Sequence, residues 1–131
     1  MKRKILIVED NVGLSQIQKD WLSQAGYEAV TAMNEPIARS LIRKTQFDLI
    51  LSDVRLPEGD GISLLEWLRK EKKDIPFIIT TEYVSVPDVV RTIKLGARDY
   101  LPKPVHRDYL LELAEDIFHP VATVRKQERQ L

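Results

Sequence analysis

The sequence predicts an α/β domain built on a five-stranded parallel sheet with helices on both faces. Five apolar runs of strand length alternate with longer segments of helical periodicity. This alternation is typical of strand–helix units joined by right-handed crossovers. Several runs are apolar at consecutive positions, as strands covered on both faces require. We expect a doubly wound sheet with the strand order 2-1-3-4-5, in which ligands bind at the carboxyl ends of the strands.

The predicted strands are the five apolar runs. In chain order they cover residues 5–8, 27–32, 47–51, 77–81 and 99–101. A helix is predicted after each strand, where apolar residues step by three and four positions. These steps run through residues 14–25, 37–42, 65–68, 86–93 and 110–117. The residues expected among the most buried are strand residues: Ile5, Ile7, Leu49, Leu51 and Ile78.

Turn and cap residues separate the predicted elements. Gly26 and Gly96 follow the first and fourth helices, where glycine closes a helix in the left-handed conformation. Asn34 precedes Glu35-Pro36, a suitable start for the second helix because proline is tolerated in the first turn. The segment Glu58-Gly59-Asp60-Gly61 predicts a turn before the third helix.

One domain is expected at residues 1–119. The dipeptide His119-Pro120 interrupts the helical pattern, and the residues after it are rich in charge. Residues 120–131 are therefore predicted to form a C-terminal helical extension or a linker. An output domain is absent from this chain, which is expected to be a single-domain relay or a fragment.

The bulk composition argues against several classes of protein. The chain has 131 residues with 20 basic and 20 acidic side chains, so no net field recruits nucleic acid or an anionic membrane. It has no cysteine, which excludes disulfides and thiolate metal sites and fits a cytoplasmic protein. The apolar run near the N-terminus is too short for the core of a signal peptide, and no run approaches the length of a membrane span.

Acidic residues mark the ends of the first and third predicted strands. Glu9 and Asp10 follow the first strand, and Asp53 follows the third. Because these strand ends meet at one edge of the sheet, the three carboxylates are expected to cluster. Clustered carboxylates repel one another unless a cation joins them, and Mg²⁺ suits oxygen ligands. We expect Asp10 to bind Mg²⁺ directly and the longer Glu9 through water, although both acids also suit a helix N-terminus.

Asp53 is the centre of the predicted chemistry, because a carboxylate at a strand end can attack phosphorus and form an acyl phosphate. Lys103 lies between two prolines after the fifth strand, where its ammonium neutralises a phosphoryl oxygen. The bond before Pro104 is compatible with a cis conformation. Thr80 and Thr81 end the fourth strand, where a hydroxyl can donate to a phosphoryl oxygen or a β-branched residue can simply fill the strand.

From about residue 3 to residue 118, the chain resembles the receiver domain of two-component response regulators, which has a flavodoxin-like fold. The match is specific because five separated motifs occur in order. The acceptor loop and the end of the fourth unit carry much of it: Asp53-Val54-Arg55-Leu56-Pro57 followed by Gly59-Asp60-Gly61, and Ile93-Lys94-Leu95-Gly96-Ala97-Arg98-Asp99-Tyr100-Leu101.

The resemblance implies a role for each site residue. Asp53 corresponds to the phosphoacceptor, and the acidic pair and the lysine correspond to Glu9, Asp10 and Lys103. The backbone carbonyl of Arg55 is implied as a further metal ligand. The hydroxyl residue and the switch aromatic correspond to Thr81 and Tyr100. Thr81 is favoured over Thr80 because Tyr83 then lies two residues later, where the family often has an aromatic residue.

The resemblance also implies partners. A sensor histidine kinase or a phosphotransfer protein is the expected phosphoryl donor to Asp53, with Mg²⁺ as the cofactor. Thr81 and Tyr100 are expected to reposition and to relay the change to an output domain or a partner. The fourth helix, the fifth strand and the fifth helix form the expected output face, which suits a homodimer. Such a domain is not an enzyme beyond self-catalysed phosphotransfer and autodephosphorylation, and it binds neither nucleic acid nor membrane itself.

Three other functions fit parts of the sequence. A Mg²⁺-dependent phosphohydrolase usually needs a second acid two residues after its nucleophile, where this chain has Arg55. A flavin carrier needs a hydroxyl-rich phosphate loop after the first strand, where Asp10-Asn11-Val12-Gly13 is acidic. A receiver-like interaction module without phosphorylation is supported only by Glu82, which stands where the family usually has a small residue. Glu82 either faces the acceptor and obstructs it or turns to solvent.

Overall fold

The structure, a computed structural model, describes residues 2–120. The main strands are β1 (Lys4–Val8), β2 (Glu28–Ala32), β3 (Leu49–Asp53), β6 (Phe77–Thr81) and β7 (Asp99–Pro102). A short hairpin consists of β4 (Arg55–Leu56) and β5 (Gly59–Asp60). The helices are α1 (Val12–Gln24), α2 (Glu35–Lys44), α3 (Gly61–Lys70), α4 (Val86–Lys94) and α5 (Arg107–Phe118). None of these described helices has the length and apolar character that a membrane crossing needs.

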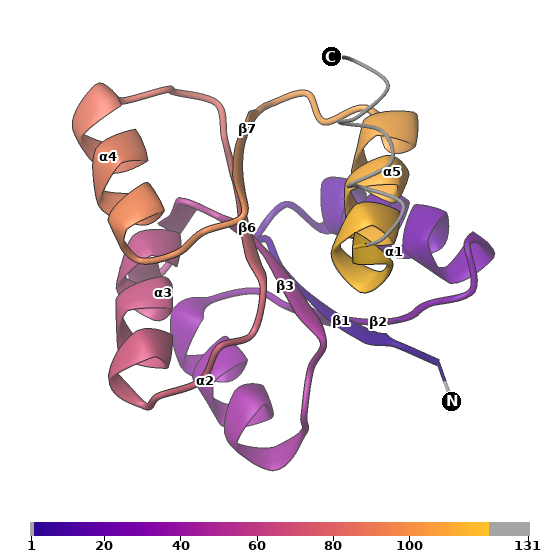
Figure 1. Cartoon of the computed structure of the whole chain (residues 1–131), viewed down its shortest axis with the longest axis horizontal. Helices are drawn as coiled ribbons and strands as arrows, with labels where there is room; N and C mark the ends of the chain where they lie inside the picture. Colours follow the sequence, from indigo (N-terminus) through magenta and orange to yellow (C-terminus); the bar gives the residue numbers. More distant parts are fainter. Residues whose placement is uncertain (1, 121–131) are drawn as a thin grey trace.

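The predicted sheet is confirmed (Figure 1). Its strand order is β2-β1-β3-β6-β7, and each neighbouring pair is parallel. Because β4 and β5 form a separate antiparallel hairpin, β6 and β7 are the fourth and fifth strands of the predicted order. The predicted extension at residues 120–131 lies, apart from Pro120, outside the described residues.

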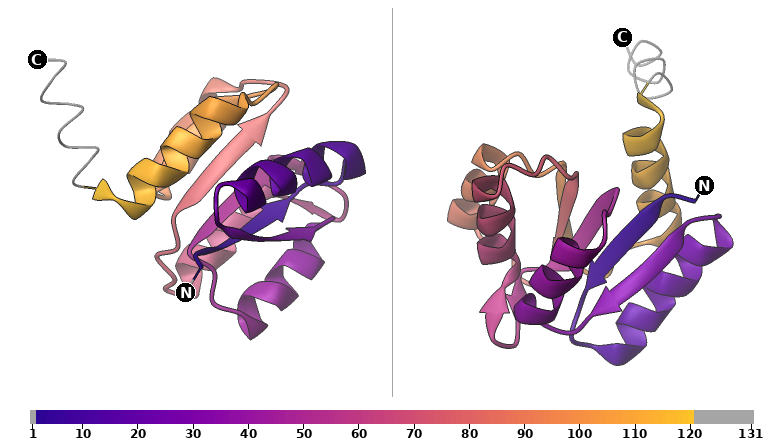
Figure 2. Two further views of the ribbon diagram at one scale, coloured as in Figure 1. Left: turned by 90° about the vertical axis from the view of Figure 1, so that its right-hand side faces the viewer. Right: turned by 90° about the horizontal axis from the view of Figure 1, so that it is seen from below.

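Helices cover both faces of the sheet. Helices α1 and α5 lie on one face, and α2, α3 and α4 lie on the other (Figures 1 and 2). Successive side chains of a strand point to opposite faces. In β1, Ile5 and Ile7 accordingly join the core cluster under α1 and α5, whereas Leu6 and Val8 join the cluster under α2 and α3. The five residues expected to be most buried are each at most 1 % exposed.

The predicted helix caps are confirmed. Gly26 and Gly96 follow the C-terminal caps of α1 and α4 with φ of 96° and 80°, a conformation that glycine adopts without a steric cost. The Asn34 side chain accepts a hydrogen bond from the Ile37 N–H at 2.9 Å, which caps α2. At α1 the cap is Asn11 rather than the acid pair before it.

The apolar steps located the helices but did not always mark their buried faces. Ile17, part of the predicted stripe of α1, is 48 % exposed. The buried residues of α1 are Ser15, Gln18 and Leu22. Among the nine described residues of α4, Thr92 alone is buried. The exposed apolar residues of α4 are Val86, Val90 and Ile93.

Two boundaries near the site differ from the prediction. β3 begins and ends two residues later than the apolar run. It extends to residue 53 because the polar residues Ser52 and Asp53 still pair in register with β6. Asp53 is therefore the last residue of the strand, opposite Thr80. The predicted turn before α3 is part of the β4–β5 hairpin, in which Arg55 pairs with Asp60. Asp60 also caps α3 through the Ser63 N–H.

Candidate functional site

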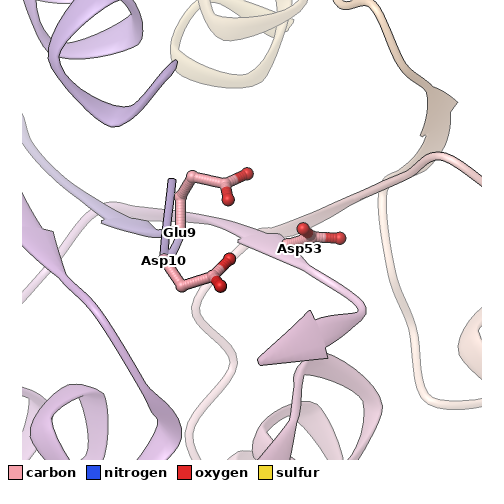
Figure 3. Close-up of side chains that lie close together, drawn as sticks. All are labelled: Glu9, Asp10 and Asp53. Carbon is pink, nitrogen blue, oxygen red and sulfur yellow. The ribbon is translucent and has the colours of Figure 1, made fainter. Parts of the chain in front are cut away.

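Three carboxylates meet at the carboxyl edge of the sheet (Figure 3). Glu9 and Asp10 follow β1, and Asp53 ends β3, the neighbouring strand. One oxygen from each carboxylate lies within 4.8 Å of those from the other two. Glu9 and Asp53 are buried, whereas Asp10 is exposed. Oxygen donors at this spacing fit a hard divalent cation such as Mg²⁺.

Lys103 bridges the two buried acids. Its Nζ lies 2.7 Å from Glu9 Oε1 and 2.7 Å from Asp53 Oδ2. The Lys103 backbone N–H donates to the Thr81 carbonyl at 2.7 Å, which fixes the loop after β7 against the end of β6. The peptide bond between Lys103 and Pro104 is cis. The fold thus brings a lysine to an acid that lies 50 residues away in the sequence.

One cation serves two buried anions, so negative charge is in excess at this site. Burial raises the pKa of Glu9 and outweighs the hydrogen bonds from Lys103 and Asn11, which lower it. Burial would lower the pKa of Lys103, but its hydrogen bonds to Asp53 and Glu9 raise it above the ordinary value. The lysine is therefore charged at neutral pH, and a further cation would relieve the remaining repulsion.

Backbone contacts fix the loop that follows Asp53. The Val54 N–H donates to the Thr80 carbonyl at 3.0 Å, and the Val54 carbonyl accepts from the Gly61 N–H at 2.8 Å. A Cβ on Gly61 would lie 2.1 Å from the Asp53 carbonyl oxygen, so a side chain has no room there. The Arg55 N–H lies beside the Asp53 carboxylate, with its nitrogen 3.4 Å from Asp53 Oδ1.

The two threonines at the end of β6 have different surroundings. Thr81 lines the cleft that contains Asp53. Its hydroxyl accepts from the Tyr83 N–H at 3.1 Å and donates to the Tyr83 carbonyl at 3.0 Å. The Thr80 hydroxyl is 3.5 Å from the Ser52 carbonyl and does not line that cleft. Of these two threonines, Thr81 is thus the one that lines the cleft at Asp53.

Tyr100 in β7 is half-buried and packs against the core cluster under α2 and α3. Its hydroxyl is buried and makes no hydrogen bond of ordinary geometry within the described residues. Burial raises the pKa of this phenol, and two nearby polar groups, the Ser85 backbone and the Thr81 side chain, lower it in part. Tyr100 therefore lies near the Thr81 side chain and the N-cap of α4.

A cleft of about 270 Å³ opens at Asp53. It is lined by Asp10, Asp53, Arg55, Thr81, Glu82 and Tyr83. The Arg55 guanidinium carbon lies 4.5 Å from the centre of the Tyr83 ring. This cation–π contact joins β4 to the loop after β6. The sequence does not predict this contact, because Arg55 and Tyr83 are distant in the sequence and share no local pattern. Glu82 is exposed, and it also lines the cleft.

Comparison with known proteins identifies relatives. A family model described as the response regulator receiver domain matches residues 5–115. The transcriptional regulatory protein ZraR of Klebsiella oxytoca is 39 % identical over 116 residues, which are 88 % of this chain and 26 % of ZraR. The probable transcriptional regulator ycf27 of Cyanophora paradoxa is 39 % identical over 103 residues, which are 79 % of this chain and 43 % of that protein. The chain thus spans less than half the length of these relatives.

Solved structures show the same fold. A CheY-like response regulator receiver domain protein from Methanospirillum hungatei superposes with a TM-score of 0.85 at 30 % identity, and the match covers all of both chains. The non-phosphorylated HemR receiver domain from Leptospira biflexa superposes with a TM-score of 0.83 at 36 % identity, over 90 % of this chain and 95 % of that one.

Proposed function

The chain belongs to the family of response regulator receiver domains, and we propose that it is a phosphorylation-dependent switch of a two-component system in a bacterial cytoplasm. A sensor histidine kinase or a phosphotransfer protein supplies the phosphoryl group, and Asp53 accepts it. The observation that carries this proposal is the Lys103 ammonium held 2.7 Å from both Glu9 and Asp53 at the edge of an acidic cleft.

The proposed transfer is a displacement at phosphorus. A carboxylate oxygen of Asp53 bonds to phosphorus while the phosphorus–nitrogen bond to the donor histidine breaks. The bonding electrons stay on the ring nitrogen, which takes a proton from water to give neutral imidazole. Lys103 is already hydrogen-bonded to Asp53, so its ammonium can offset charge on the incoming group. Thr81 lines the same cleft and offers a hydroxyl to that group.

Mg²⁺ fits the donor set of the cleft. Asp10 and Asp53 would hold it with the Arg55 carbonyl, and Glu9 would contact it through water. Both oxygens of Glu9 are engaged, one with Lys103 Nζ and the other with the Asn11 N–H at 3.1 Å. Asp10 is exposed in the cleft, which favours it as the direct ligand. When bound, the cation neutralises charge that develops on the phosphoryl oxygens.

The proposed output is a change at α4, β7 and α5. Movement of Thr81 toward a phosphoryl group would change its bonds to Tyr83 and its contact with Tyr100. Such a face suits self-association or an output domain. Two charged residues of this face already have partners inside the chain. Arg91 pairs with Glu66, and Asp99 accepts a hydrogen bond from the Tyr109 hydroxyl.

Intact mass spectrometry tests the acceptor. Incubation with phosphoramidate and Mg²⁺ should add one phosphoryl group to the parent and to the control Asp20→Asn, an exposed acid on α1. Asp53→Ala should remain unmodified, as should the parent in excess EDTA. A single stable modification of Asp53→Ala would refute the assignment. An unmodified parent would instead favour the interaction module without phosphorylation.

Metal titration tests the ligand set. Asp10→Asn should weaken Mg²⁺ binding more than Glu9→Gln does, because we propose that Asp10 contacts the cation directly. Lys103→Ala should still bind Mg²⁺, but the conformational change that starts at Asp53 should reach β7 only weakly. Amide chemical shifts followed during the titration report both effects. Parent-like Mg²⁺ affinity in Asp10→Asn would show that the ligand assignment is wrong.

Sedimentation velocity tests the output face. A phosphoryl mimic such as beryllofluoride should shift the parent from monomer to dimer if α4, β7 and α5 self-associate. Substitution of the exposed residues Lys94 and Arg98 by glutamate should reduce that shift without changing phosphorylation of Asp53. A parent that stays monomeric with the mimic would leave a different protein as the partner of this face.

A further inference from the structure

A buried acid outside the candidate site, Glu35, supports the loop that follows Asp53. Glu35 is the first residue of α2 and is 5 % exposed. Its Oε1 accepts a hydrogen bond from the Asp60 backbone N–H at 3.0 Å, and its Oε2 accepts one from Arg39 Nε at 2.8 Å. The carboxylate thus links the Asp60 N–H of the β4–β5 hairpin to the Arg39 guanidinium on its own helix.

The hairpin backbone is shaped around this carboxylate. Gly59 has φ of 142°, and a Cβ there would lie 2.3 Å from Glu35 Oε1. Glu58, the residue before it, has φ of 54°, which is left-handed and unusual for a residue other than glycine. Such a conformation persists where surrounding contacts hold it. Glu35 packs directly on this segment and supplies one of those contacts.

Glu35 also completes the cap of α3. Asp60 is the N-cap residue, and its Oδ1 accepts from the Ser63 N–H at 2.6 Å. In a capping box, a glutamate at the third helical position returns a bond to the N-cap N–H. The third position of α3 is Ser63, and Glu35 of α2 supplies the carboxylate instead. The start of α3 is therefore fixed by a neighbouring helix.

The Arg39 side chain holds the carboxylate in place. Its guanidinium carbon lies 5.1 Å from the centre of the Trp67 ring of α3, and that of Arg43 lies 5.2 Å from the same ring. Arg39 is thus positioned by α3 while it pairs with Glu35. A buried carboxylate with a fixed partner keeps a defined orientation.

Two backbone links connect this network to the acceptor. Asp60, which Glu35 holds, pairs in register with Arg55. The next residue, Gly61, donates to the Val54 carbonyl and leaves no room for a Cβ beside the Asp53 carbonyl. We infer that Glu35 is a positioning residue for the Mg²⁺ and phosphoryl site, which it does not touch. It fixes the strand opposite Arg55 and thereby the carbonyl that Arg55 offers to the cation. The identity of that cation rests on the proposed function.

Mg²⁺ titration followed by amide chemical shifts tests this inference on four variants. Glu35→Ala removes the acceptor, and Glu35→Asp withdraws it by one methylene. Both should raise the Mg²⁺ dissociation constant about tenfold, the low end of the effect of outer-shell partners. Glu35→Gln keeps an oxygen for the Asp60 N–H and should stay within about threefold of the parent. Ile42→Val, a buried control on the same helix, should lower stability and leave Mg²⁺ affinity unchanged.

Hydrogen exchange supplies a readout without metal. The Asp60 amide should exchange faster in Glu35→Ala and Glu35→Asp than in the parent, and at nearly the parent rate in Glu35→Gln. Parent-like Mg²⁺ affinity in Glu35→Ala or Glu35→Asp would overturn the inference, as would a Glu35→Gln variant as weak as Glu35→Ala. If Glu35→Ala does not fold, Glu35→Asp decides. An equal loss of affinity in Ile42→Val would also overturn it, by showing that stability alone sets the affinity.

Failure of the proposed function has a different signature. A parent that binds Mg²⁺ but takes no phosphoryl group on Asp53 refutes the phosphorylation proposal, and the comparison of Mg²⁺ affinities still decides the role of Glu35. A phosphorylated parent with unaffected Glu35 variants overturns the inference alone. A parent that does not bind Mg²⁺ refutes both.

Discussion

Helices α3 and α4 are neighbours on one face of the sheet, yet the core holds them very differently. The buried residues of α3 are Gly61, Ile62, Leu64, Leu65 and Leu68, half of its ten residues. Of the nine residues of α4, Thr92 alone is buried. Helix α3 begins directly after the β4–β5 hairpin that follows Asp53, whereas α4 begins after the loop that follows Thr81 and contains Tyr83.

Hydrogen bonds from α3 hold the carboxyl end of α4. Arg69 of α3 donates to the Leu95 carbonyl at 2.7 Å and to the Gly96 carbonyl at 3.3 Å. At the amino end, Tyr83 and Val84 are each 61 % exposed. Regions with few buried apolar contacts open most readily. The buried residues of α3 therefore hold this helix rigidly next to Asp53. The amino end of α4 is the part of this face of the sheet that can move most easily.

Core substitutions should show the largest contrast between the two helices. Leu65→Ala in α3 removes a fully buried side chain and should lower the free energy of unfolding by about 2–5 kcal/mol. Val90→Ala in α4 removes an exposed one and should cost about 0.5 kcal/mol or less. Urea denaturation measures both. Equal losses would show that α4 is packed as firmly as α3.

Removal of the hydrogen bonds of Arg69 should give the next largest loss in the free energy of unfolding. Arg69→Met keeps an apolar stem but removes the donors to the carbonyls of Leu95, Lys73 and Ile75. The expected loss is about 1.5–3 kcal/mol, because several carbonyls lose a charged donor. Amide exchange at Gly96 and Ala97 should accelerate. The exposed control Lys94→Met should change neither quantity, and an unchanged exchange rate in Arg69→Met would show that the attachment is elsewhere.

A smaller effect is expected from Glu82, in the loop before α4. Its exposed carboxylate lines the cleft of Asp53, so it should repel an anionic donor, with most of the repulsion screened by water and salt. Glu82→Ala should therefore accelerate phosphorylation by a small donor about threefold and shorten the lifetime of the aspartyl phosphate. Stopped-flow kinetics measure the rate, with Glu71→Ala as an exposed control. Equal rates would mean that Glu82 turns to solvent, and weaker transfer from the kinase alone would indicate a kinase contact.

The exposed ion pair between the helices should give the smallest effect. Arg91 holds the pKa of Glu66 below the ordinary value of 4.5 through a hydrogen bond and its charge. A carboxyl whose pKa is lower in the folded state contributes stability above its unfolded pKa and loses it as the pH falls through the folded pKa. The contribution of this pair should thus be present at neutral pH and decline below about pH 4.5. A carboxyl NMR titration should show the low midpoint, and Arg91→Gln should return it to the ordinary value.

The sequence by itself determined the five main strands, the five helices and their order. Apolar runs and helical steps depend on local residue types, so the five parallel strands and the caps at Gly26, Asn34 and Gly96 could be predicted. The clustering of Glu9, Asp10 and Asp53 followed as well, because parallel strands end at one edge of the sheet. The proposed roles of these residues remain predictions for the experiments above.

Tertiary structure decided which surfaces meet. Val90 and Ile93 have the spacing of a buried face, but both side chains are exposed, and Thr92 is the residue of α4 that the core covers. Gln18 is buried in α1 although its residue type favours solvent. The contacts of Glu35 with Asp60 and of Arg55 with Tyr83 join separate elements, so no local pattern contains them. Packing between distant segments fixes such contacts, because burial and charge pairing depend on what the fold places opposite each side chain.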